Sequence, residues 1–144
     1  GSGALGLEAL SRGADFAVFA DKARPAQECV QKNIQALRME ARARLLRCHW
    51  KMALKKLEDE GERFDLIFLD PPYRMEGANE MLSALCAGKI CGPETLVIYE
   101  HAKALLPDTA GWETLDRRDY RDTVITFLRK EAHGDADGVV SGIV

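Results

Sequence analysis

The sequence has no long apolar run, no excess of basic residues and no regular cysteine spacing. No apolar run comes near the roughly 20 residues that a membrane-spanning helix requires, and no signal peptide is recognisable, so we expect a cytoplasmic protein with no membrane partner. The four cysteines lack the paired spacing of a zinc site, so we expect no metal and reduced, mostly buried thiols. The net charge of −3 argues against a simple nucleic-acid binder, because such proteins are usually basic.

Length and composition predict a single globular domain. With 144 residues, 47% of them hydrophobic, the chain is long enough to bury a substantial core. Its basic residues gather in two stretches, each of which is either an ordinary solvated face or an RNA contact. The first stretch holds Arg42, Arg44, Arg47, Lys51, Lys55 and Lys56, and the second holds Arg117, Arg118 and Arg121.

The most informative stretch runs from Phe64 to Tyr73. Leu66 to Leu69 are four consecutive apolar residues, a pattern typical of a short strand that is buried on both faces. Pro71 and Pro72 have no N–H to donate, so the strand is predicted to end at Asp70. In an open parallel sheet, ligands bind at the carboxyl ends of the strands, which is where this prediction places the Asp70 side chain.

The groups at that edge match an amino group on a flat base. The Asp70 carboxylate and the Pro71 carbonyl are two acceptors for the two hydrogens of an –NH2 group. Tyr73 offers a ring on which a nucleobase taken out of its stack can lie. The plainer alternative is a strand that ends in a proline turn with a solvated aspartate.

A glycine-rich segment at the start of the chain predicts a second binding element. Gly3 precedes a predicted helix over Ala4–Arg12, with Gly13 placed to end it, and glycines there let the backbone approach a ligand closely. Asp21 follows a predicted strand over Phe16–Ala20 and is suited to accept hydrogen bonds from both hydroxyls of a ribose. Tight packing for the glycines, and a favourable charge at the next helix N-terminus for Asp21, are the structural alternatives.

Two motifs resemble a known enzyme family. Asp70-Pro71-Pro72-Tyr73 resembles the [DNS]-P-P-[YF] motif of S-adenosylmethionine-dependent methyltransferases that act on exocyclic amino groups. The segment from Gly1 to Ala14 resembles the glycine loop and first helix of the bacterial small-subunit rRNA guanine-N2 methyltransferases, the RsmD family, and the resemblance covers most of the chain. It implies a Rossmann-like class I methyltransferase fold, S-adenosyl-L-methionine as cofactor, and 16S rRNA or the small ribosomal subunit as partner.

The resemblance also implies roles for single residues. The methionine part of the cofactor would lie over the glycine loop, and its ribose at Asp21. The residues expected to contact the cofactor are Gly1, Ser2, Gly3, Asp21, Lys22, His49, Trp50 and Asp70, and those expected at the target amine are Asp70, Pro71, Pro72 and Tyr73.

The position of His49 departs from the family, which generally has an aspartate there to meet the adenine amino group. A neutral ring nitrogen of His49 would accept from that amine, or Trp50 would stack on the adenine. Packing of Trp50 against the sheet, with neither residue at the cofactor, is the structural alternative.

The remaining pattern predicts alternating helices and strands. Pro25 is placed in the first turn of a helix whose apolar stripe is Cys29, Val30, Ile34 and Leu37. Further strands are predicted over residues 44–48, 95–99, 112–120 and 123–129, with one helix opening at His49 and another running through Met81, Leu82 and Leu85 until Gly88 and Gly92-Pro93 break it. Together they predict a doubly wound α/β fold, a mostly parallel sheet with an antiparallel hairpin at its C-terminal edge.

The two ends of the chain carry separate expectations. No strand precedes Gly1, so the first strand is expected to be missing from a methyltransferase domain over residues 1–130 that is truncated at its N-terminus. Residues 131–144 form a predicted tail, and its β-branched end, residues 138–144, would either occupy the vacant place in the sheet or simply fray.

These observations favour a methyltransferase that modifies guanine N2 of 16S rRNA. The alternatives are an adenine-N6 methyltransferase, a non-catalytic truncated domain that binds RNA or a partner, and an NAD-binding domain. The last fits the spacing of Gly1, Gly3 and Gly6 but does not predict Asp-Pro-Pro-Tyr. Glu100-His101 suggests acid–base chemistry, but methyl transfer to an amine hardly needs it, so we interpret His101 as structural or substrate-positioning.

Overall fold

The computed structural model describes residues 3–70, 77–105 and 107–131. The chain divides into two compact units, Gly1–Glu60 and Gly61–Val144, and each is described by itself. The place predicted for the C-terminal tail lies outside the described residues, so that idea stays a prediction.

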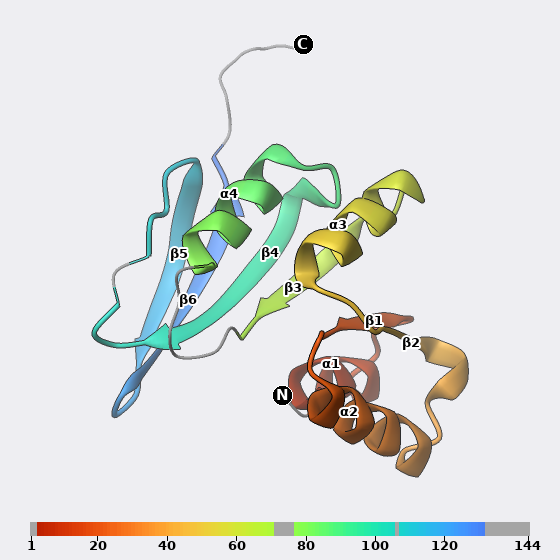
Figure 1. The fold of residues 1–144 in the computed structure, drawn as a ribbon. Helices are drawn as coiled ribbons and strands as arrows, with labels where there is room; N and C mark the ends of the chain where they lie inside the picture. Colours follow the sequence, from red (N-terminus) through yellow and green to blue (C-terminus); the bar gives the residue numbers. More distant parts are fainter. Residues whose placement is uncertain (1–2, 71–76, 106, 132–144) are drawn as a thin grey trace. The chain divides into compact units, whose positions relative to one another are not determined.

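The first unit is a βαβ arrangement with one helix before it and one after it (Figure 1). It contains α1 (Ala4–Ser11), β1 (Ala17–Ala20), α2 (Arg24–Ala36), the short 3-10 helix η1 (Glu40–Arg42), β2 (Ala43–Leu46) and α3 (Trp50–Asp59). Strands β1 and β2 pair in parallel, from Ala17 beside Ala43 to Ala20 beside Leu46. The predicted order of elements is confirmed here, although β2 begins one residue earlier and ends two residues earlier than predicted.

The core of this unit is formed by one face of each of the first two helices. Leu7 and Leu10 of α1 are buried together with Val30 and Ile34 of α2. Smaller or partly buried hydrophobic side chains pack around these four residues: Ala14, Ala17, Phe19, Met39, Ala43 and Leu45. The predicted pairing of Leu7 with Leu10 on one helix face is therefore confirmed.

The apolar stripe predicted for α2 is wrong at two of its four positions. Cys29 is exposed and Leu37 is 53% exposed, whereas the polar Gln27 is buried. Gln27 tolerates burial because its amide is hydrogen-bonded: Nε2 donates to the Asp21 carbonyl at 2.9 Å, and Oε1 accepts from Arg47 at 3.4 Å. The buried face of α2 therefore includes a polar residue whose amide is hydrogen-bonded, in addition to apolar residues.

The glycines of the N-terminal segment have separate structural causes. Gly3 is the N-cap of α1 and has φ 77°, a left-handed conformation that favours glycine. Gly6 lies inside α1 where the helix meets β1, and a Cβ atom there would stand 2.5 Å from Cε1 and 2.8 Å from Cζ of Phe19. The packing alternative is correct for Gly6, because that contact leaves no room for a side chain.

Replacing Gly6 with alanine is expected to lower the free energy of unfolding by about 1–3 kcal/mol, because the Phe19 ring must leave its place in the core. Urea denaturation measures the change. Gly77→Ala is the comparison, since a Cβ at Gly77 meets nothing within 4 Å; because Gly77 is the N-cap of α4, we expect a loss that is measurable but smaller than that of Gly6→Ala. Adding Phe19→Leu should restore part of the loss caused by Gly6→Ala; equal losses for the single and the double variant would contradict this explanation.

Arg42 holds the C-terminal end of α1. Its Nη2 donates to the carbonyl oxygens of Leu10, at 2.9 Å, and of Ala14, while its Nε donates to the Asp15 carbonyl at 3.4 Å. The last carbonyl groups of a helix have no partner within the helix, so a guanidinium is well suited to satisfy them. This residue of the first basic stretch therefore has a structural role.

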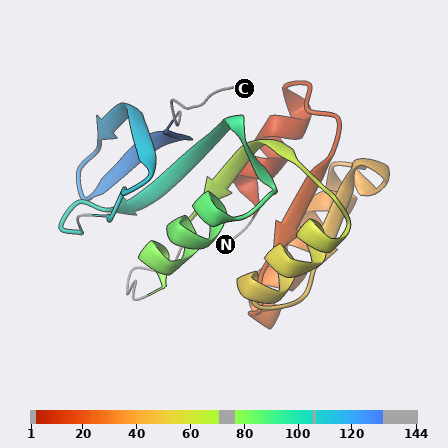
Figure 2. The ribbon, with the colours of Figure 1, turned by 90° about the horizontal axis from the view of Figure 1, so that it is seen from above.

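The second unit is a four-stranded sheet with one helix against a face of it (Figures 1 and 2). It contains β3 (Phe64–Leu69), α4 (Ala78–Ala87), β4 (Cys91–Ala102), β5 (Trp112–Asp119) and β6 (Thr123–Lys130). The strand order is β3-β4-β6-β5, in which β3 and β4 are parallel and the other two pairings are antiparallel. The predicted antiparallel hairpin at the C-terminal edge is confirmed, with its turn at Arg121 and Asp122.

Strand β3 ends at Leu69, one residue before the end predicted from the prolines, and it is not buried on both faces. Leu66 is 42% exposed, and only Leu69 in this strand is buried. Among the described strands, β4 is the one pairing partner of β3.

Strand β4 begins earlier than predicted and includes Gly92 and Pro93. The pairing shifts between Phe64 and Leu66, and a side chain closes this irregularity. Thr95 Oγ1 accepts from the Gly92 amide at 2.8 Å and donates to the Phe64 carbonyl at 2.6 Å. The glycine and proline thus mark a bulge at the start of a strand rather than the end of a helix.

Candidate active site

Asp70 lies at the carboxyl end of β3. The last registered pair of the parallel strands is Leu69 beside Tyr99, and Asp70 and Glu100 are the next residues of the two strands. The Asp70 side chain is exposed, as a residue that must reach a ligand would be. Pro71, Pro72 and Tyr73 lie outside the described residues, so their predicted roles at the target amine stay predictions.

Glu100, which the sequence suggested only as part of a Glu-His pair for acid–base chemistry, is a further candidate for the site. Burial raises the pKa of its carboxyl, and the negative charge of Asp70 raises it further. Among the described residues, no hydrogen bond or ion pair to this carboxylate is found. Only the register of β3 with β4 shows that Glu100 lies next to Asp70, and the sequence carries no signal for that register.

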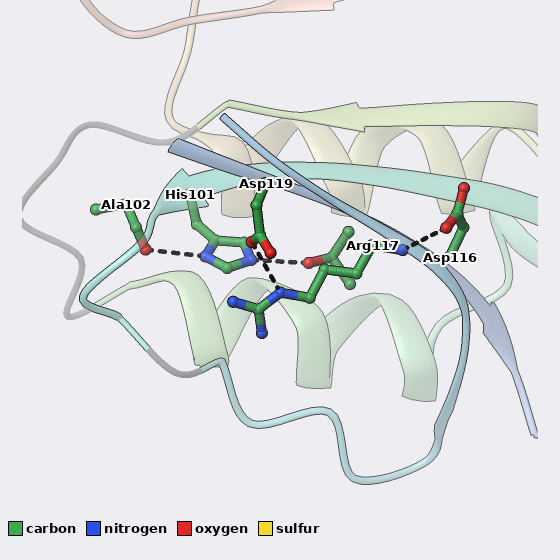
Figure 3. Close-up of polar contacts among 6 residues, drawn as sticks. His101, Ala102, Asp116, Arg117 and Asp119 are labelled. Atoms are coloured by element: carbon green, nitrogen blue, oxygen red, sulfur yellow. Dashed lines mark hydrogen bonds and ion pairs between the residues drawn. The ribbon is translucent and has the colours of Figure 1, made fainter. Parts of the chain in front are cut away.

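His101 is a structural residue, in agreement with one of the two predicted interpretations. It is 5% exposed, and both ring nitrogens are hydrogen-bonded: Nδ1 with the Ala102 carbonyl at 3.1 Å and Nε2 with Thr126 Oγ1 at 2.8 Å (Figure 3). Because a carbonyl only accepts, Nδ1 carries a proton in this arrangement, and Nε2 shares a hydrogen bond with the threonine hydroxyl. The ring centroid lies 4.8 Å from that of Tyr99.

Asp21 lies at the carboxyl end of β1, in the turn that leads to Ala23, the N-cap of α2. Its Oδ1 accepts from the Ala23 amide at 2.8 Å, and its own amide donates to the Leu46 carbonyl at 3.2 Å. One carboxylate oxygen therefore serves the start of the helix, as the structural alternative proposed. The other oxygen has no hydrogen bond to a described residue, so the ribose prediction keeps an acceptor. Lys22, next along the chain, is exposed.

His49 is the N-cap of α3, and this bears on the predicted contact with adenine. Its Nδ1 accepts from the Lys51 amide at 3.1 Å. A neutral ring that accepts through Nδ1 carries its proton on Nε2, so the free nitrogen is a donor. His49 is thus poorly suited to accept from an adenine amine, although it can donate to an adenine ring nitrogen. Trp50 is half-buried, with its ring 5.5 Å from that of His49.

Comparison with known proteins shows the family to which this chain belongs. A family model described as "Conserved hypothetical protein 95" matches residues 1–129. The chain is 32% identical to YlbH of Bacillus subtilis over 132 residues, which cover 90% of this chain and 72% of that protein. It is 30% identical to "Ribosomal RNA small subunit methyltransferase D" of Escherichia coli, over 95% of this chain and 68% of that protein. The chain therefore belongs to the family of that model, which includes the RsmD methyltransferases.

Solved structures support the fold of this RsmD-like methyltransferase. A conserved protein from Streptococcus pyogenes superposes with a TM-score of 0.82 at 35% identity, covering 92% of this chain and 82% of that one. The structure of SMU.776 complexed with SAH superposes with a TM-score of 0.73 over 89% of this chain and 42% of that one. At 13% identity, the second likeness concerns the fold alone. The predicted family and the Rossmann-like α/β fold are confirmed. S-adenosyl-L-methionine as the cofactor of this chain stays a prediction.

The basic stretches of this methyltransferase are largely paired within the chain. In the first, Arg44 forms two hydrogen bonds with Glu60, at 2.7 and 2.9 Å, and the bond from Arg44 lowers the pKa of the Glu60 carboxyl. In the second, Arg117 pairs with Asp119 and Arg118 with Asp116, each at 3.2 Å (Figure 3 shows Arg117 with Asp119). Such exposed pairs are weak, so RNA contact by these residues stays a prediction.

Two further expectations concern metals and membranes. Within residues 3–70, 77–105 and 107–131, no cluster of three or more His, Cys, Asp or Glu side chains is arranged to hold a metal ion. No helix in the same part of the chain has the length and apolar character to span a membrane.

The prediction of mostly buried thiols is wrong. All four cysteines are free, but only Cys91 is buried, and Cys29 is exposed on α2.

Proposed function

We propose that this methyltransferase modifies the exocyclic N2 amine of a guanine in 16S rRNA, as free RNA or within the small ribosomal subunit. The observation that carries the proposal is the exposed carboxylate of Asp70 at the carboxyl end of a parallel strand, directly before Pro71, Pro72 and Tyr73. The Escherichia coli relative named for the small subunit supports the choice of RNA. We place this activity in residues 1–130, with 131–144 as a tail, and in the cytoplasm.

The motif residues would act mainly by positioning. The Asp70 carboxylate and the Pro71 carbonyl accept the two amine hydrogens, which aims the nitrogen lone pair along the line of transfer. The same acceptors stabilise the positive charge that develops on nitrogen. Pro72 keeps the turn rigid, and Tyr73 stacks on the base.

The residues of the first unit fit the cofactor. S-adenosyl-L-methionine supplies the methyl group on a sulfonium, which is already a good leaving group. Gly1, Ser2 and Gly3 would approach its methionine part, and the φ of 77° at Gly3 gives a turn that a larger residue disfavours. The free oxygen of Asp21 would bind the ribose, with Lys22 alongside. Trp50 would stack on the adenine and the Nε2 proton of His49 would meet one of its ring nitrogens.

A methylation assay tests this proposal directly. Tritiated S-adenosyl-L-methionine is supplied with unmodified 16S rRNA, with small subunits and with 23S rRNA, and the labelled nucleoside is identified after digestion. We expect N2-methylguanosine from 16S rRNA or from small subunits. Label in N6-methyladenosine would support the adenine alternative. No transfer together with no cofactor binding in calorimetry would support a non-catalytic domain.

The turn between β5 and β6 is a further place where RNA contact is expected. It lies at the carboxyl end of β4, because Ala102 pairs with Thr123. The Tyr120 amide donates to the Thr123 carbonyl at 2.8 Å, and Tyr120 is 52% exposed. Arg121 is exposed next to it, so the turn combines a ring for stacking with a cation for phosphate.

Tyr120→Ala combined with Arg121→Glu is expected to raise KM for RNA by about tenfold, through the lost stacking and the reversed charge. The affinity for S-adenosyl-L-methionine should not change. Arg63→Glu is the control, since Arg63 is exposed just before the opposite, amino-terminal end of β3. An equal rise in KM for the control would show that net charge alone, and not the turn, governs RNA affinity.

A further inference from the structure

Asp70, the residue after the end of β3, and Glu100, within β4, lie close together at the carboxyl end of these parallel strands. They are the next residues after the registered pair Leu69 and Tyr99, and the charge of Asp70 acts on the Glu100 carboxyl. Side chains alternate along a strand, so Glu100 points away from the face on which Tyr99 is buried. The alternation is visible in β4, where Tyr99 and His101 are buried and Glu100 is half-buried.

The Glu100 carboxylate has no compensating partner among the described residues. It is half-buried beside another acid, and the pKa of its carboxyl is raised by that burial and by Asp70. A partly desolvated carboxylate without a donor is unfavourable for folding, and such groups cluster where a ligand supplies the missing donor. Glu100 therefore extends the site of Asp70 and does not form a site of its own.

The two carboxylates match the hydrogen-bonding edge of guanine and mismatch that of adenine. Guanine presents N1–H directly beside its N2 amine, so two neighbouring acceptors meet two neighbouring donors. Adenine presents its N6 amine beside an unprotonated N1, which is itself an acceptor. A second carboxylate next to Asp70 would face that lone pair and repel it.

We propose that Glu100 determines the choice of base: its carboxylate accepts the N1–H of the target guanine while Asp70 accepts from the N2 amine. This inference rests on the proposed function, since it assumes that a guanine amine is the methyl acceptor. Glu100 takes no proton and no methyl group in the reaction. Its role is to orient guanine and to reject bases that lack a donor at N1.

The test uses RNA carrying 2-aminopurine in place of guanine at the nucleotide mapped by the methylation assay. This base keeps the 2-amino group but has an unprotonated N1. The wild-type protein should methylate the guanine RNA at least about tenfold better in kcat/KM than the 2-aminopurine RNA. Glu100→Gln should narrow that ratio to about threefold or less, because a glutamine amide can donate to the unprotonated N1 or accept from N1–H.

Controls separate the role of Glu100 from other effects. Glu94→Gln, at an exposed acid near the start of β4, should leave the ratio as in the wild type. Inosine, which keeps N1–H but lacks the amine, should give no transfer. Calorimetry with S-adenosyl-L-methionine should give the same affinity for wild type and Glu100→Gln, which shows that the variant is folded.

The outcomes distinguish failure of this inference from failure of the proposed function. If the wild type transfers no methyl group to guanine, the proposed function fails, and the inference fails with it. If guanine is methylated but Glu100→Gln discriminates as strongly as the wild type, Glu100 does not select the base and only the inference is overturned. A wild-type ratio near one overturns the inference without any variant.

Discussion

Replacing Asp70 with alanine is expected to reduce methyl transfer at least about 100-fold, because the variant loses the carboxylate that orients the amine and stabilises its developing charge. Folding should be unaffected, since Asp70 is exposed and follows the last residue of β3. Transfer of tritium to RNA at saturating cofactor measures the loss. Asp65→Ala is the matched control, because Asp65 is an exposed aspartate on the same strand, and it should retain full activity.

Asp70→Asn refines this prediction. Asparagine keeps one acceptor oxygen and is allowed in the [DNS]-P-P-[YF] motif, so it should lose less activity than alanine. A ranking of wild type, then asparagine, then alanine would agree with an acceptor role. Full turnover by the alanine variant would contradict any role for this carboxylate in the reaction.

Replacing Asp21 with alanine is expected to weaken S-adenosyl-L-methionine binding by about 10–100-fold, the effect of losing hydrogen bonds between a charged acceptor and a ribose. The same variant loses the bond from Oδ1 to the Ala23 amide, which should cost about 1 kcal/mol of stability. Isothermal calorimetry measures the affinity, and urea denaturation the stability.

Asp21→Asn separates the two roles of this side chain. Asparagine still has an oxygen for the Ala23 amide, so stability should stay near that of the wild type while affinity falls to an intermediate value. Asp15→Ala, at an exposed aspartate of the same unit, should change neither quantity. If Asp21→Ala binds the cofactor as tightly as the wild type, Asp21 only stabilises the turn before α2.

The parts of the fold that local chemistry controls were predictable from the sequence. The prolines after Asp70 place the end of β3, and Gly13, with φ 112°, follows the end of α1. The two strands predicted on either side of the polar Arg121-Asp122 turn agree with β5 and β6 to within a residue. The signals are local: prolines cannot donate to a strand ladder, a glycine readily adopts a positive φ, and polar residues favour a turn.

The features that escaped prediction depend on contacts between segments distant in the sequence. Arg42 binds carbonyl groups 28 and 32 positions away, and nothing in its local pattern separates it from the other basic residues of its stretch. Gln27 is buried because Asp21 and Arg47 satisfy its amide. Glu100 became a candidate only when strand register placed it beside Asp70. Local patterns carry no information about such partners.

Asp70 and Glu100, the neighbouring acids at the ends of β3 and β4, also affect how the stability of the folded protein can be increased. A raised pKa means that the folded state favours the protonated form of Glu100, so its ionisation at neutral pH works against folding. Glu100→Gln should therefore increase resistance to urea at pH 7 while it relaxes the choice of base. Selection for thermostability alone would tend to replace Glu100, and the protein would then lose its discrimination between guanine and bases without a donor at N1.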